Sequence, residues 1–219
     1  MTPEVQTASL WIVFALSHIG LSSPPVRNRL CSALGLTAFR GLYSVIALAL
    51  FIPLVSIYFG SRHEGELLFF LPRTPLFFYS IYALMGVAFL LATAGILQPS
   101  PASAAAGRDA SRVVGIARIT RHPLMMGFAL FAATHLLVSG QLIDLCFFGG
   151  FAAFSVLGAW HQDRRMVSES ERFAAFAQEA PFIPFSGPNR LLGLRELSPW
   201  IWVVGIGLAF AVRMFLHPW

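Results

Sequence analysis

Six apolar segments constrain this chain more than any other feature, because each is close to the length that a helix needs to cross a bilayer. A spanning helix takes about 20 apolar residues, since lipid offers no partner for unpaired backbone groups. The segments run over residues 5–23, 41–60, 75–97, 123–139, 141–160 and 199–217. The sequence therefore predicts an all-α integral membrane protein, with one domain over residues 1–219 built as a bundle of about six transmembrane helices.

The composition agrees with a membrane protein and argues against a soluble one. Hydrophobic residues make up 57% of the chain and charged residues 11%, whereas a soluble domain carries about 25% charged residues. The net charge is +5, and all 15 basic residues are arginine. In a membrane protein such a charge is typical of loops that face anionic lipid, so we expect membrane lipid as a partner and no nucleic acid.

The distribution of arginine predicts the orientation. With six spans, the connections 24–40, 98–122 and 161–198 lie on one side and hold twelve of the 15 arginines. The positive-inside rule places that side in the cytoplasm. We therefore expect both termini on the non-cytoplasmic side, in a bacterial inner membrane.

Two stretches outside the spans have a recognisable character. Residues 161–180 carry Met166, Phe173 and Phe176 among charged residues, which predicts an amphipathic helix lying on the cytoplasmic surface. Residues 98–110 are rich in proline, alanine and serine and are expected to form a flexible loop.

Smaller features predict contacts within the spans. Gly149 and Ala153 are four residues apart in the fifth segment, as suits close helix packing. Asp144 is the only acidic residue near a span, and we expect it to cap the start of the fifth one.

His18 and His135 are the histidines that fall inside predicted spans, whereas His217 stands at the end of the sixth one. An ionisable residue inside a span is costly and by default suggests a function. Imidazole is a common metal ligand and an axial ligand of haem, and small residues surround both positions. Two readings stay open: the pair binds a flat cofactor such as haem, or each histidine makes a hydrogen bond between helices.

A second group of polar residues is expected on the cytoplasmic side. His122, His161 and Asp163 could form a polar or metal site there, as an alternative to the pair within the spans. Arg121 and Arg164 could hold haem propionates or another anionic cofactor. Arginines at span ends also commonly reach lipid phosphates, which is the simpler reading of each one.

Several blocks of sequence give the chain a family resemblance. "FALSHIGLSS", "AFRGLYSVIAL", "GIARITRHPLMMG" and "GAWHQDRR" followed by "PFIPF" cover most of its length. The chain resembles the NnrU-type membrane proteins, and among them the branch that contains 15-cis-zeta-carotene isomerase.

The resemblance implies a haem b ligated by His18 and His135, which would make these residues both metal ligands and catalytic residues. It also implies a haem-dependent cis–trans isomerase whose substrate is a lipophilic polyene from carotenoid biosynthesis, with an electron donor as a further partner. One position departs from the branch. Ala132 stands where the isomerase has a cysteine three residues before its second haem histidine, so a thiolate ligand is lost here.

Three other functions stay open at this point. NnrU proteins are associated with nitrite and nitric oxide metabolism in denitrification, which would make nitric oxide the ligand. The block Arg121-His122-Pro123 also occurs in membrane methyltransferases that bind S-adenosylmethionine, although Met125 stands where these usually have tyrosine. A non-catalytic cytochrome subunit of a membrane complex would equally suit two histidine ligands.

Overall fold

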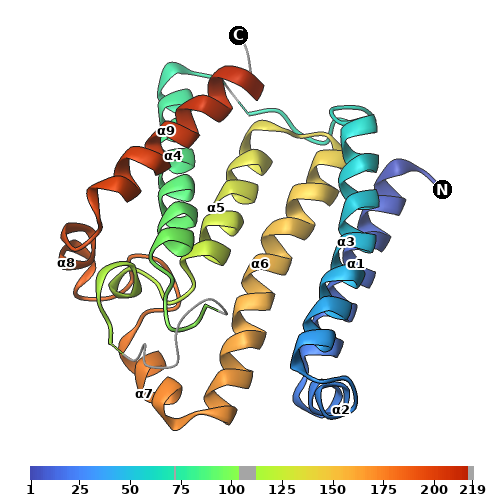
Figure 1. Cartoon of the computed structure of the whole chain (residues 1–219). Coiled ribbons are helices and arrows are strands. Elements are labelled where there is room, and N and C mark those ends of the chain that lie inside the picture. Colours follow the sequence, from blue (N-terminus) through green and yellow to red (C-terminus); the bar gives the residue numbers. More distant parts are fainter. Residues whose placement is uncertain (72, 104–111, 217–219) are drawn as a thin grey trace. The chain divides into compact units, whose positions relative to one another are not determined.

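The protein is described here by a computed structural model covering residues 1–71, 73–103 and 112–216. The all-α prediction is confirmed: these residues hold nine α-helices and one short 3-10 helix (Figure 1). In chain order they are α1 (Pro3–Ser22), α2 (Pro24–Leu34), α3 (Leu36–Ser61), α4 (Pro75–Leu97), η1 (Gly115–Arg118), α5 (Pro123–Val138), α6 (Leu142–Glu169), α7 (Glu171–Glu179), α8 (Arg190–Arg195) and α9 (Pro199–Leu216).

Within the part of the chain that the structure describes, four helices are long and apolar enough to cross a membrane, namely α1, α3, α4 and α6. Two further apolar helices, α5 and α9, are shorter. The 16 residues of α5 rise about 24 Å, less than the roughly 30 Å of a hydrocarbon core. The helices support an integral membrane protein, while a count of six spans stays a prediction.

Proline sets the starts of the helices that the sequence placed best. Pro75, Pro123 and Pro199 each occupy the first position of a helix, where a fixed φ favours the helix and no N–H is missed. Thr74 adds a cap to α4, because its hydroxyl accepts a hydrogen bond from the Phe77 amide at 3.2 Å. These local signals explain why the predicted starts at 75, 123 and 199 are correct.

The first loop differs from the prediction. Residues 24–40 were expected to connect two spans, but they contain α2 and the first turn of α3. Gly35 separates the two helices with a φ of 81°, a left-handed conformation that glycine adopts without strain. The apolar pattern shows which part of a helix is hydrophobic, but it does not show where the backbone hydrogen bonds of the helix begin. The helix α3 therefore starts at Leu36 rather than at residue 41.

The predicted surface helix over 161–180 is wrong as a single element. Its first half continues α6 to Glu169, and Ser170 then caps the separate helix α7 by accepting a bond from the Phe173 amide. Phe173 and Phe176 are buried against Ala102, Ala117 and Ala180. An amphipathic stripe fits lipid and protein equally well, and here it packs on protein. The predicted loop 98–110 lies outside the described residues from 104 onward.

The chain divides into two compact units, with α5 and α6 each contributing to both. The first unit comprises residues 1–71 and 135–154, where α1 packs along α3 (Figure 1). The second comprises residues 72–134 and 155–219, where α4 packs along α9. Its core gathers fully buried residues from four elements, including Leu91, Ile116 and Ile201.

Candidate functional site

His18 is held by its own helix in the first unit. Its Nδ1 lies 2.9 Å from the carbonyl oxygen of Phe14, one turn earlier on α1. A carbonyl can only accept, so Nδ1 donates and the neutral ring carries its lone pair on Nε2. A histidine that ligates a metal usually donates its other ring N–H to such a carbonyl. The ring also packs against Phe14, Tyr43 and Phe154.

His135 belongs to the same unit, near the end of α5. Its ring stacks on Phe148 with centroids 4.2 Å apart. Phe148 and Phe154, the respective partners of His135 and His18 on α6, are six residues apart, which corresponds to a rise of about 9 Å. The two imidazoles therefore contact α6 at different levels along its axis.

An aromatic cluster centred on Trp11 occupies the first unit between these levels. The Trp11 ring contacts Phe14, Phe51, Phe147, Phe151 and Phe154. Two buried polar atoms, Thr7 Oγ1 and Trp11 Nε1, have no hydrogen-bond partner among the described residues. Because buried polar groups are nearly always paired, these two atoms indicate that a ligand or water completes the unit.

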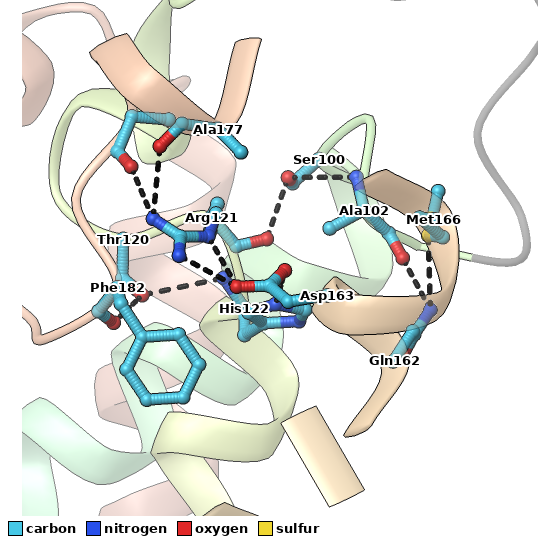
Figure 2. Close-up of polar contacts among 11 residues, drawn as sticks. Ser100, Ala102, Thr120, Arg121, His122, Gln162, Asp163, Met166, Ala177 and Phe182 are labelled. Atoms are coloured by element: carbon cyan, nitrogen blue, oxygen red, sulfur yellow. Dashed lines mark hydrogen bonds and ion pairs between the residues drawn. The ribbon is translucent and has the colours of Figure 1, made fainter. Parts of the chain in front are cut away.

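A dense polar cluster marks the start of α5 in the second unit (Figure 2). His122 Nε2 lies 2.5 Å from one carboxylate oxygen of Asp163, and Arg121 Nη2 lies 2.6 Å from the other. His122 and Asp163 are buried, and Arg121 is mostly so. The carboxylate is thus shared between two side chains that are adjacent in sequence.

Backbone carbonyls accept further hydrogen bonds from the Arg121 guanidinium. Its Nη1 donates to the carbonyl of Ala177 at 3.2 Å (Figure 2). The same nitrogen donates to the carbonyl of Ala180 at 2.6 Å. The Ser100 hydroxyl donates to the Arg121 carbonyl at 2.7 Å. We name this set of bonds the Arg121–Asp163 clasp: it joins α5 to α6, α7 and the turn after α4.

The other two residues expected on this side are placed differently. His161 lies two residues before Asp163 on α6, and residues two apart on a helix do not face each other. The Arg164 guanidinium lies over the Trp160 ring, 4.8 Å from its centroid. Within the described ranges no group of three or more His, Cys, Asp or Glu could hold a metal ion. The cofactor roles of Arg121 and Arg164 stay predictions.

One buried polar site in the first unit was not recognised from the sequence. Asp144 is fully buried and does not cap α6; it accepts hydrogen bonds from Tyr58 at 2.9 Å and from His63 Nδ1 at 3.0 Å. The available signal was an acidic residue at the edge of an apolar segment, which ordinarily requires a partner. The partners themselves come from α3 and the residues after it, more than 80 positions away.

Comparisons with known proteins identify two plant enzymes that this chain resembles in sequence. The chain is 30% identical over 192 residues to the chloroplastic 15-cis-zeta-carotene isomerase of Arabidopsis thaliana, covering 84% of this chain and 50% of that protein. It is 28% identical over 198 residues to the enzyme of the same name from Zea mays, with the same coverage. The chain thus spans about half the length of these relatives. No solved structure matches it significantly.

The family comparison extends over nearly the whole chain. The family described as "NnrU protein" matches residues 7–219, which include all nine α-helices in whole or in part. The chain belongs to the NnrU family.

Proposed function

We propose that this protein is a haem b-dependent membrane enzyme that catalyses cis–trans isomerisation of a lipophilic polyene. The observation that carries the proposal is His18, whose Nδ1 is tied to a backbone carbonyl so that Nε2 is the ligating nitrogen. His135 lies in the same unit, and the similarity to two carotene isomerases supports the substrate class.

The residues of the first unit fit haem b in their chemistry. Neutral imidazole is a usual axial ligand of a low-spin haem, and His18 and His135 would each provide one. The aromatic cluster around Trp11 supplies the apolar walls, and Thr7 Oγ1 and Trp11 Nε1 are buried donors that still lack a partner among the described residues. Arg121 lies in the second unit and is already bonded in the clasp, so propionate binding does not rest on it.

The chain's own contribution is binding, orientation and exclusion of water. Apolar aromatic side chains bind a polyene through its hydrocarbon surface. The Phe14 carbonyl holds the His18 ring in one tautomer. Bound haem iron would supply reversible one-electron chemistry beside the double bond. Ala132, buried one turn before His135, offers no thiolate as an exchanging ligand.

The first experiment is a visible absorption spectrum of the detergent-purified protein, oxidised and then reduced with dithionite. A sharp Soret band with split reduced α and β bands is expected for haem b with two histidine ligands. Conversion of a poly-cis carotene by the reduced protein, with nitric oxide binding as a comparison, then tests the reaction. A featureless spectrum after haem-sufficient expression would reject the proposal and favour a test of S-adenosylmethionine binding.

Single substitutions test the ligands. His18→Ala and His135→Ala should each lose haem while the protein stays in the membrane, because each removes one axial nitrogen. His161→Ala is the matched control, since it also removes a partly buried histidine but should retain the full Soret absorbance. Full haem occupancy in either ligand variant would show that the assignment of that histidine is wrong.

A further inference from the structure

The loop after α3 exposes an unusual run of apolar side chains. Residues 67–71, with the sequence Leu-Leu-Phe-Phe-Leu, are between 37% and 65% exposed and form no helix. A contiguous exposed apolar surface of this kind ordinarily marks a site of interaction with a membrane or another molecule.

Backbone hydrogen bonds hold this loop in place. The Leu68 amide donates to the Gly140 carbonyl, and the Leu142 amide donates to the Glu66 carbonyl, both at 2.9 Å. Leu67 and Gln141 form an isolated antiparallel bridge. Gly140 permits this approach, because a Cβ there would collide with the Phe69 carbonyl. The exposure of the apolar run is therefore a property of a fixed backbone.

A polar latch fixes the base of the loop. His63 donates a hydrogen bond from Nδ1 to one oxygen of the fully buried Asp144 carboxylate. The Tyr58 hydroxyl donates to the other oxygen of the same carboxylate. The latch requires a φ of 61° at His63, a left-handed conformation that histidine adopts more readily than most residues. The His63 side chain itself is 54% exposed and that of Asp144 is fully buried, so the latch joins the surface of the protein to its interior.

The apolar run comes a few residues after an exposed apolar stripe of α3. The exposed residues Val45, Leu48, Ile52 and Phe59 fall within an arc of about 60° on that helix. Because α3 is long and apolar enough to cross a membrane, this stripe faces acyl chains. Residues 62–66, which separate the stripe from the run, are polar apart from Gly65 and suit the depth of lipid headgroups.

We propose that residues 67–71 insert into the interfacial layer of the bilayer, at the upper end of the acyl chains, and that the His63–Asp144 latch holds them at that depth. Phospholipid is thus the partner of this surface. Backbone groups at membrane depth need partners within the protein. The bond from the Leu68 amide to the Gly140 carbonyl supplies one within the run, and the bond from the Leu142 amide supplies one to Glu66 just before it. The proposal is independent of whether the protein binds haem.

The test is a depth measurement on the full chain in phospholipid nanodiscs. A nitroxide is attached at Leu68→Cys or Phe70→Cys after Cys31 and Cys146 are replaced by serine. Leu48→Cys, on the α3 stripe, is the control inside lipid, and Glu64→Cys is the control at the aqueous side. Labels at 68 and 70 should collide several-fold more with oxygen, relative to a water-soluble nickel chelate, than the label at 64.

Two results would overturn the proposal. One is a nickel accessibility at 68 and 70 equal to that at 64. The other is spin–spin broadening at 68 or 70, which would show that a second copy of the chain covers the run.

Asp144→Asn with the label at 70 tests the latch, because loss of the bond between His63 and the Asp144 carboxylate should raise nickel accessibility several-fold. An unchanged value there would reject the role of the latch, and brominated-lipid quenching of Phe70→Trp provides a second depth measure.

Discussion

Gly149 and Gly150 are adjacent in α6, but only at Gly150 would an added side chain meet a neighbouring residue. Gly149 and Ala153 were expected to form the close helix contact, but nothing lies within 4 Å of a Cβ placed at Gly149. A Cβ at Gly150 would instead collide with the Trp11 indole. The sequence shows two small residues side by side, and only the direction of each Cα–Cβ bond decides which one faces α1.

Gly150→Ala should therefore lower stability, because the added methyl displaces the ring at the centre of the aromatic cluster. Overpacking of this kind costs about 1–3 kcal/mol. Gly149→Ala is the matched control and should be neutral or slightly stabilising, since alanine is the better helix former. Thermal unfolding in detergent followed by circular dichroism measures both. Equal melting temperatures for the two variants would contradict the packing described here.

Tyr58→Phe removes one of the two donors to the buried Asp144 carboxylate. The variant leaves that oxygen unsatisfied, which should cost about 1–3 kcal/mol. Tyr79→Phe removes a hydroxyl from a side chain that is 71% exposed and should change nothing measurable. Denaturant unfolding of the two variants and the parent protein in the same detergent gives the comparison. A Tyr58→Phe protein as stable as the parent would show that the bond to Asp144 is not needed for folding.

At the scale of elements, the Arg121–Asp163 clasp explains why the start of α5 is so well defined. The conformation of Pro123 favours a helix start, but it does not say where that helix docks. Asp163 on α6 and the carbonyls at the end of α7 determine this by binding Arg121 and His122. The sequence suggested that these residues gather, because their spans end on one predicted side. The sequence could not show that Arg121 and His122 bind other residues of the protein rather than lipid or a cofactor.

Asp163→Ala should loosen the start of α5 and the segment after α7. Removing one partner of a buried ion pair leaves Arg121 without its counter-charge, at a cost of about 3 kcal/mol. Glu169→Ala, an exposed acidic residue at the end of the same helix, is the control. Hydrogen exchange should rise over residues 120–126 and 180–186 in the first variant only. Unchanged exchange there would mean that the clasp does not stabilise this end of α5.

The contact between η1 and the residues after α8 should be sensitive to acid. Arg118 donates to Glu196 at 2.9 Å and the Gly115 amide donates to the same oxygen, and these bonds hold the pKa of Glu196 below its ordinary value. The stabilisation is therefore complete at neutral pH. It is lost as the pH falls below the ordinary pKa of a glutamate carboxyl and through the lowered pKa of the folded state.

Hydrogen exchange at Gly115 measures this dependence, with protection expected to fall as the pH is lowered through that range after correction for the intrinsic rate. Glu196→Gln keeps an acceptor but cannot titrate, so its protection should be weaker and independent of pH. Equal acid sensitivity in Glu196→Gln and the parent protein would assign the effect to another group.

For the whole molecule, the membrane topology depends on whether the short helix α5 crosses the bilayer. If α5 crosses, α6 returns the chain to the arginine-rich side, and Glu171 lies in the cytoplasm with the N-terminus outside. If only the four long helices before α7 cross, Glu171 lies outside. A membrane-impermeant maleimide applied to intact cells should label Glu64→Cys and leave Glu171→Cys unlabelled. Labelling of both would reject six spans and support a shorter, partly inserted α5.

The sequence by itself determined the helical class, the starts of α4, α5 and α9 and the family resemblance. These properties depend on local composition: apolar length, proline at a first turn and short motifs. It also singled out His18 and His135, because a histidine in an apolar span is conspicuous without knowledge of its neighbours.

Only the tertiary structure decided which side chains share a partner. Asp144 accepts hydrogen bonds from Tyr58 and His63. Trp11 packs against Gly150 rather than Gly149. Phe173 packs on protein rather than lipid. In each case the choice depends on the rotation of one helix about its axis relative to another. That rotation is set by the packing of many side chains together, and no single stretch of sequence encodes it.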